Sequence, residues 1–158
     1  MGSEERDQAR DKHFLVAVDD SESSKRAVLY VADLLGGLPG VAVTLFNVIP
    51  EPEEDFFDRP EDEPTWVKER MRRANILLEN YRRILVQAGF PEEKVKIRSC
   101  VNEDTSLVDA ILATHCDLSC CTVVVGRHHK SKTEEFLFGS TSSKLIHEAR
   151  NCAVWVVE

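Results

Sequence analysis

Five short apolar runs, separated by segments with helical periodicity, dominate the pattern of hydrophobic and polar positions along the chain. The runs are rich in β-branched residues, which is typical of strands. They cover residues 14–18, 41–50, 93–100, 121–126 and 152–157. Because most of these runs are apolar without a polar face, we expect the strands to lie in a sheet that is covered on both sides.

Four helices are predicted between the strands, because each connecting segment has a capping residue at its start, a stop signal at its end, or both. The longest, over residues 65–89, repeats apolar residues at spacings of four and three, which is typical of a helix with one buried face. One helix follows the first strand, and the others fill residues 103–115 and 140–151. The expected caps and stops are, in chain order, Asp20 or Ser21, Gly36-Gly37, Gly89, Asp104 or Thr105, and Asn151.

Strands and helices alternate from the first strand to the last, without an internal repeat. Strict alternation predicts a parallel sheet with helices on both faces, because each right-handed crossover returns its helix to one face. We therefore expect one three-layer αβα domain over residues 13–158, preceded by a flexible lead-in over residues 1–12. Ligands of such folds bind beyond the carboxyl ends of the strands. The residues at those ends are Asp19-Asp20, 47–50, Val101-Asn102 and those from Gly126 onward.

The composition excludes several classes of function. With 42% hydrophobic and 30% charged residues, the chain is typical of a soluble globular domain. Its formal net charge of -8 argues against general binding to nucleic acids or anionic membranes. No apolar run approaches the roughly 20 residues of a membrane span. Because the first residues are polar and contain no apolar signal core, we expect a cytoplasmic protein.

One connecting segment, residues 51–64, is rich in acidic residues and proline, and we predict a loop there. It contains an apolar pair, Phe56-Phe57, which is unusual for an exposed loop. We expect this pair to pack onto the body of the domain, with a lid or a partner contact as the alternative.

The five cysteines match neither a disulfide framework nor a metal site. Their number is odd, and Cys120 and Cys121 are adjacent, which is unlike the spacing of secreted disulfide-bonded domains. Together with the preceding His115 and Cys116, they could form a metal site, but the four residues lack the C-x2-C spacing of zinc sites. We expect these cysteines to be small, mostly buried apolar residues, and we expect no metal.

The segment after the fourth strand has the composition of an anion-binding loop. Gly126 ends an apolar strand, the next residues from Arg127 to Lys130 are basic, and Gly139-Ser140 opens the last helix. Free backbone N–H groups and the partial positive charge at a helix start favour an anion. Hydroxyl and guanidinium groups add further donors.

Over residues 14–157 the chain resembles the universal stress protein family. Three stretches carry the resemblance: FLVAVDDSESSKRAV, VTLFNVIP and VVVGRHHKSKTEEFLFGSTS. The third is similar to the family's phosphate loop, G-x2-G-x9-G-[ST], with Gly126, Gly139 and Ser140 at the matching positions. It departs from the pattern at His129, which replaces the second glycine. In the second stretch, Asn47 stands where the family usually has His.

The resemblance implies an open five-stranded parallel sheet in the order 3-2-1-4-5, with Asp19 and Gly126 on neighbouring strands. It implies ATP or AMP as the ligand, with Mg²⁺ as a companion of ATP. In this reading Asp19 lies near adenine or ribose, and Val48 bonds adenine through its main chain. His129 either strains the loop or donates to a phosphate. The implied nucleotide-binding residues are Ala17, Val18, Asp19, Val48, Gly126, Arg127, His129, Gly139, Ser140, Thr141 and Ser142.

The resemblance also implies a homodimer through the C-terminal strand. A short, apolar strand at the edge of a sheet favours such pairing on physical grounds as well. We find no catalytic constellation and no P-loop, so we expect a binding protein in stress response or signalling, with slow ATP hydrolysis at most. The dimer contacts are expected from Ala153, Val154, Trp155 and Val156.

Two other functions stay open. An interaction module of the same fold would signal through dimerisation without nucleotide, which His129 and Val101 favour because both occupy family glycine positions. A phospho-receiver domain would use Asp19-Asp20 as its acidic pair. That fold also needs an acceptor Asp at the end of the third strand, and Asp104 lies too far along the chain.

Overall fold

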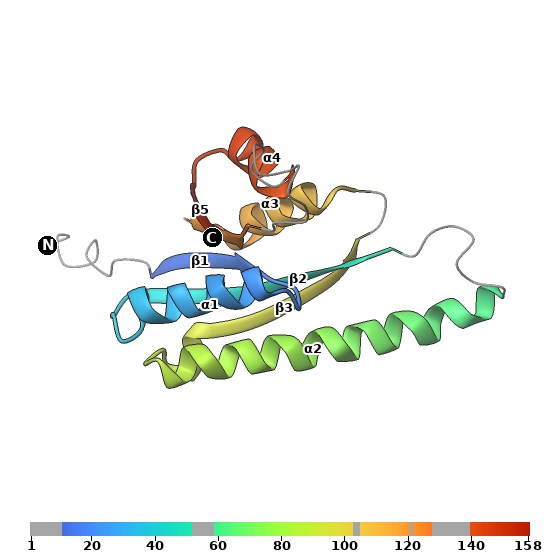
Figure 1. The fold of residues 1–158 in the computed structure, drawn as a ribbon, viewed down its shortest axis with the longest axis horizontal. Coiled ribbons are helices and arrows are strands. Elements are labelled where there is room, and N and C mark those ends of the chain that lie inside the picture. The colour runs from blue at the N-terminus through green and yellow to red at the C-terminus, as the bar shows by residue number, and fades with distance from the viewer. Residues whose placement is uncertain (1–10, 52–58, 103–104, 121, 128–139) are drawn as a thin grey trace, which may run out of the picture.

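Five parallel strands form one sheet in the order β3-β2-β1-β4-β5, which confirms the predicted fold (Figure 1). The computed structural model describes residues 11–51, 59–102, 105–120, 122–127 and 140–158. The strands are β1 (Lys12–Ala17), β2 (Val41–Pro50), β3 (Val95–Asn102), β4 (Thr122–Gly126) and β5 (Ala153–Val157). The helices are α1 (Glu22–Leu35), α2 (Glu63–Gln87), α3 (Leu107–Leu118) and α4 (Ser140–Glu148). Two short 3-10 turns, Pro60–Asp62 and Glu92–Lys94, precede α2 and β3.

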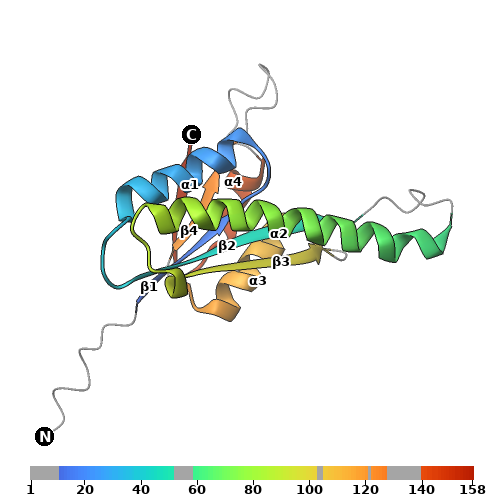
Figure 2. The same cartoon turned by 90° about the horizontal axis from the view of Figure 1, so that it is seen from below.

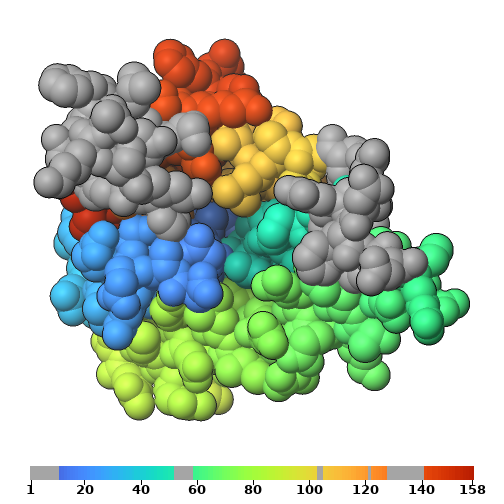
Figure 3. All heavy atoms as spheres, turned by 45° about the vertical axis from the view of Figure 1, so that its right-hand side comes forward, coloured from blue at the N-terminus to red at the C-terminus, as the bar shows by residue number. Residues whose placement is uncertain are grey.

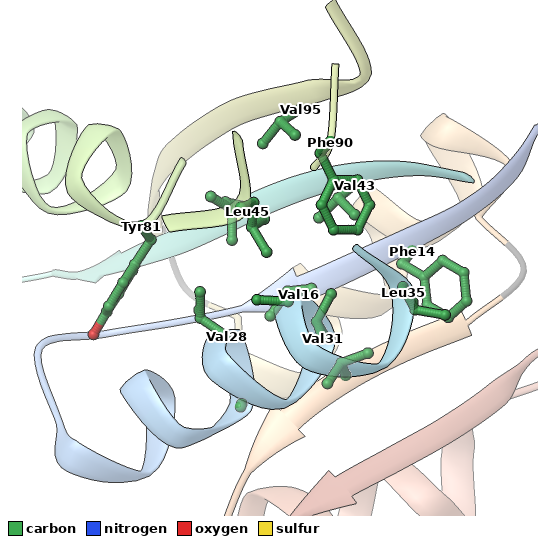
Figure 4. Close-up of a cluster of buried hydrophobic side chains, with 14 of the residues drawn as sticks. Phe14, Val16, Val28, Val31, Leu35, Val43, Leu45, Tyr81, Phe90 and Val95 are labelled. Atoms are coloured by element: carbon green, nitrogen blue, oxygen red, sulfur yellow. The ribbon is translucent and has the colours of Figure 1, made fainter. Parts of the chain in front are cut away.

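The helices cover both faces of the sheet, with α1 and α2 on one side and α3 and α4 on the other (Figures 1 and 2). Successive strand residues point to opposite faces, so Phe14 and Val16 pack under α1 and α2 while Leu15 packs under α3 and α4. The inner strands β1, β2 and β4 are therefore mostly buried on both faces, whereas β3 and β5 at the two edges are partly exposed. The larger core cluster, between the sheet and the pair α1 and α2, is drawn in Figure 4.

Several element boundaries differ from the sequence-based expectation. β1 begins at Lys12 and ends at Ala17, so Val18 follows the strand instead of closing it. α2 begins at Glu63, and Pro64 therefore belongs to its first turn and not to the acidic loop. A proline is tolerated there because the first N–H groups of a helix have no partner within the helix.

Two helix ends also differ. The cap of α3 is Ser106, which forms a capping box with Asp109, so the assignment to Asp104 or Thr105 was wrong. α4 ends at Glu148, before the expected stop at Asn151, but Asn151 does adopt a left-handed conformation with φ of 57°.

Some predictions concern other parts of the chain. Phe56-Phe57 and Cys121 lie outside the described residues, so their packing stays a prediction. Among the helices in the described segments, none combines the length and the apolar character that crossing a membrane requires.

Candidate functional site

A pocket opens at the carboxyl ends of β1, β2 and β4. Here the strand order reverses: β2 and β3 follow on one side of β1, and β4 and β5 follow on the other. This is the switch point at which open α/β sheets usually bind ligands. Its volume is about 100 Å³, comparable with the engineered cavities of about 150 Å³ that take up benzene. Figure 3 shows the surface of this end, where the blue β1–α1 segment, the teal end of β2 and yellow α3 meet.

Many of the predicted nucleotide-binding residues meet at this pocket. They come from distant parts of the sequence and are brought together because the carboxyl ends of parallel strands share one edge of the sheet. The predicted residues that line it are Ala17, Val18, Asp19, Val48, Gly126 and Thr141.

The other predicted residues fall into two groups. Arg127 and Ser142 are described but do not line the pocket: the Arg127 guanidinium lies 3.0 Å from the Glu158 carboxylate, and Ser142 is 3% exposed on α4. His129 and Gly139 lie outside the described residues, and of Ser140 only the main chain, at the start of α4, is described. The phosphate contacts expected from these three therefore stay predictions.

Asp19 is held in place by hydrogen bonds with three residues, Ser21, Ser24 and Tyr81. Its main-chain N–H donates to Ser24 Oγ at 2.9 Å, and its carbonyl accepts from Tyr81 Oη at 2.9 Å. Its carboxylate oxygen Oδ1 accepts from the Ser21 N–H and from the Ser24 hydroxyl, both at 2.9 Å. The Ser21 side chain in turn caps α1 by accepting from the Ser24 N–H. The turn that orients the Asp19 side chain is thus continuous with the N-terminus of α1.

Gly126 is required at the end of β4 because the first turn of α1 packs directly against it. A Cβ atom at this position would lie 2.4 Å from the carbonyl oxygen of Ser23 and 3.0 Å from its Cβ. The first glycine of the loop pattern therefore permits close approach of a strand and a helix, and it brings Ser24 to the pocket.

The end of β2 presents a main-chain group to the pocket. The carbonyl of Phe46 accepts from the Val18 N–H at 2.8 Å, so it faces β1. The N–H and C=O of residues two apart on a strand point to the same edge, and β1 ends at Ala17. The N–H and C=O of Val48 therefore face the space beyond the end of β1, where the pocket lies.

Asn47 forms part of the framework of the pocket. Its side-chain amide is 8% exposed and donates to the carbonyl of Val18 at 2.7 Å. This bond holds the chain just after β1, where the backbone ladder to β2 stops. The position at which the resemblance implies a histidine is thus occupied by a side chain that carries no charge.

The walls of the pocket include five residues that the sequence did not single out. Leu107 and Ile111 lie one turn apart on α3, so their i, i+4 spacing would have identified the face that turns toward the sheet. Phe46 and Val125 are strand residues next to predicted ones. Ser24 is part of the Ser-rich helix start. The five are Ser24, Phe46, Leu107, Ile111 and Val125.

Charge is distributed unevenly around the pocket. Burial, together with the negative charges of Asp19, Asp20 and Glu22, raises the pKa of Tyr81 to about 12. The β1 side is therefore acidic. On the opposite side Thr141 lies in the first turn of α4, where the helix dipole favours negative charge. An anionic group is better placed toward α4 than toward Asp19.

A hydrogen bond joins α3 to α4 beside the pocket. Lys144 Nζ on α4 donates to the hydroxyl of Ser106, the cap of α3, at 3.0 Å. Hydrogen bonds from Ser106, with a smaller contribution from the Lys144 charge, lower the pKa of Asp109. The two helix starts that border the pocket are thus tied together.

No group of three or more His, Cys, Asp or Glu side chains that could hold a metal ion occurs in the described part of the chain. Cys120 is buried and Cys116 is exposed. Cys116 is therefore not the buried apolar residue that the sequence predicted.

Solved structures share this architecture. Hypothetical protein MJ0577 is 26% identical with a TM-score of 0.74, covering 93% of this chain and 95% of that chain. A universal stress protein in complex with cAMP is 16% identical with a TM-score of 0.66, covering 93% and 97%. A universal stress protein from Archaeoglobus fulgidus in complex with dAMP is 20% identical with a TM-score of 0.59, covering 92% and 96%.

Sequence comparison covers the same extent of the chain. No curated protein matches it significantly. The profile of the universal stress protein family matches residues 11–158, which is the whole of the sheet and all four helices. The chain therefore belongs to the universal stress protein family.

Proposed function

We propose that this protein binds an adenine nucleotide, AMP or ATP, in the pocket at the ends of β1, β2 and β4. The observation that carries the proposal is the make-up of the pocket: apolar walls with a few polar groups at fixed positions, which is typical of small-molecule sites. The complexes of related proteins with cAMP and with dAMP support the same class of ligand.

The lining suggests how the parts of the ligand would be distributed. The apolar walls, including Ile111 and Val125, suit a planar base, and the main-chain N–H and C=O of Val48 offer it a donor and an acceptor. Asp19 offers its carboxylate to hydroxyl or amino groups. The phosphates would extend toward Thr141 at the start of α4, since Asp19 repels them. Mg²⁺ would accompany ATP.

We propose binding without efficient turnover. The hydroxyl of Ser24 donates to the Asp19 carboxylate and accepts from the Asp19 N–H, so both of its bonds support the turn. A nucleophilic hydroxyl needs a neighbouring base that takes its proton, and that base is in turn oriented by a third group. Here the Asp19 carboxylate that accepts from Ser24 also accepts from the Ser21 N–H, so both side chains serve the turn that precedes α1. Slow hydrolysis of ATP is compatible with this role in signalling or stress response.

We also propose that the protein forms a homodimer through β5. This strand is the last of the described sheet, and Ala153 to Val157 are exposed or half-buried. Trp155 packs against Phe14 and edge-on against Tyr30 with ring centroids 5.1 and 6.2 Å away. Tyr30 and Leu34 of α1 are 47% and 49% exposed. An edge strand beside exposed apolar side chains favours pairing with a second copy.

Calorimetry with AMP and ATP tests the nucleotide proposal. Ala17→Leu would fill the pocket, and we expect it to weaken binding at least tenfold. Ala42→Leu is the matched control, because Ala42 is also half-buried on a central strand but lies at the opposite end of the sheet. We expect the control to bind like the wild type, with an affinity on the order of micromolar. A wild-type protein that binds neither nucleotide would refute the proposal and leave the interaction module.

A further inference from the structure

Of the four hydrogen bonds described above for Asp19, one comes from far along the chain. Ser21 and Ser24, which bond Asp19, lie two and five residues from it and move with the start of α1. Tyr81, whose hydroxyl donates to the Asp19 carbonyl at 2.9 Å, lies 62 residues further along, in α2. This bond alone of the four joins the turn to the other helix on that face of the sheet.

The position of the Tyr81 hydroxyl is fixed by the core. Tyr81 is 6% exposed, and its neighbours on the same face of α2, Leu78 and Leu85, are 1% and 0% exposed. Figure 4 shows Tyr81 at the edge of the core cluster, with its hydroxyl oxygen beside the connection from β1 to α1. A tightly packed ring of this kind has little freedom to follow the turn if the turn moves.

The hydroxyl also remains a donor. Burial and the nearby acidic groups raise the pKa of Tyr81 to about 12, so the phenol keeps its proton over the physiological range. A carbonyl can only accept, so this bond persists at every pH at which the protein would meet its ligand.

From this geometry we propose that Tyr81 is a positioning residue of the nucleotide site, through which α2 aims Asp19 at the ligand. The role rests on the proposed function. Without the hydroxyl, the Asp19 carbonyl loses the bond that ties it to α2, and the peptide group between Asp19 and Asp20 gains freedom to move together with Ser21 and Ser24. The Asp19 carboxylate then samples directions that do not face the pocket, and part of the binding energy is spent on ordering it.

A double-mutant cycle with AMP, read by calorimetry, tests this role. Tyr81→Phe keeps the buried ring and removes the hydroxyl, and we expect about fivefold weaker binding, as for the loss of one hydrogen bond. In an Asp19→Ala background the same change should have no further effect, because Tyr81 acts through Asp19. Tyr30→Phe is the matched control, since Tyr30 is exposed on α1, and it should bind like the wild type.

The outcomes separate the two proposals. If the wild type binds AMP and Tyr81→Phe binds equally well, the positioning role is wrong and the proposed function stands. The role is also wrong if Tyr81→Phe weakens binding by the same factor with and without Asp19, because that is a general structural effect. If the wild type binds no nucleotide, the proposed function fails and this role with it.

Amide hydrogen exchange provides a second measurement that does not depend on the Asp19→Ala variant folding. In ligand-free Tyr81→Phe, we expect the amides of Asp19 and Ser21 to exchange several-fold faster, while that of Leu45 in the centre of β2 keeps its wild-type rate. Unchanged rates at the turn, or equal acceleration in β2, would contradict the proposal.

Discussion

Replacing Gly126 by Ala should push the first turn of α1 away from β4. The added Cβ would lie 2.4 Å from the carbonyl oxygen of Ser23 and 2.5 Å from its carbonyl carbon. Real Cβ atoms essentially never approach other atoms within 3.0 Å. The turn must therefore retreat by about 0.6 Å, the difference between 3.0 and 2.4 Å, and the obstacle is backbone that cannot rotate aside.

The cost follows from two effects. Forcing extra volume into a well-packed contact costs about 1–3 kcal/mol. The retreat also stretches the two bonds between Ser24 Oγ and Asp19, now 2.9 Å, toward about 3.5 Å, where they cease to be hydrogen bonds. Their weakening adds about 1 kcal/mol. We expect the free energy of unfolding to fall by about 2–4 kcal/mol and Tm to fall by about 5–15 °C.

Urea unfolding followed by circular dichroism measures this loss, and calorimetry with AMP measures the accompanying loss of affinity. Gly40→Ala is the control: no atom lies within 4 Å of its added Cβ, but its φ of +73° makes Ala unfavourable there. That conformation costs about 1 kcal/mol, and nucleotide affinity should not change. If Gly126→Ala is as stable as Gly40→Ala and binds AMP as tightly as the wild type, the close-packing argument is refuted.

Three further predictions concern other parts of the molecule. His129→Gly should tighten ATP binding by up to about tenfold in calorimetry, by relieving a non-glycine residue at a family glycine position; weaker binding would instead show that His129 donates to phosphate. Val156→Lys, on the outer strand, should give a monomer in sedimentation, and an unchanged dimer would place the interface elsewhere. Tyr81 has its pKa raised from 10.0 to about 12 in the folded state, so its contribution to stability is complete below pH 10 and is lost as the pH rises to 12. Wild-type protein should therefore lose more stability than Tyr81→Phe between pH 9 and 11 in urea unfolding, and equal losses would contradict the assignment.

The strands were predictable from sequence because their apolar runs are bounded by clear breaks. β2 runs from Val41 to Pro50 as expected, since Gly40 precedes it and a proline ends it. Helix starts were harder. Before α3, three successive residues could all cap a helix, and only the pairing of Ser106 with Asp109 decides among them. That S-x-x-D spacing is visible in the sequence, so this error was avoidable.

The site was predictable only in part. Strand ends such as Asp19 and Gly126 follow from the alternating pattern, because topology places them together. The support of Asp19 by Tyr81 does not follow, because no local pattern relates residues 62 positions apart. The same holds for the contact of Gly126 with Ser23, which depends on how closely α1 packs on the sheet.

Three donors on the described side of the site keep one protonation state near neutral pH. Ser24 and Asn47 do not titrate, and Tyr81 has a pKa raised to about 12, so these groups still donate to Asp19 and Val18 between pH 5 and 8. The amide of Asn47 donates to the Val18 carbonyl at 2.7 Å regardless of pH. The terminal phosphate of the nucleotide titrates near pH 6–7, and so does an ordinary histidine such as His129. The contribution of His129 is therefore the part of the pH dependence of ATP affinity that is lost in His129→Gly. The difference between the pH profiles of ATP affinity of the wild type and of His129→Gly thus reports on the phosphate side of the site separately from the side that holds Asp19.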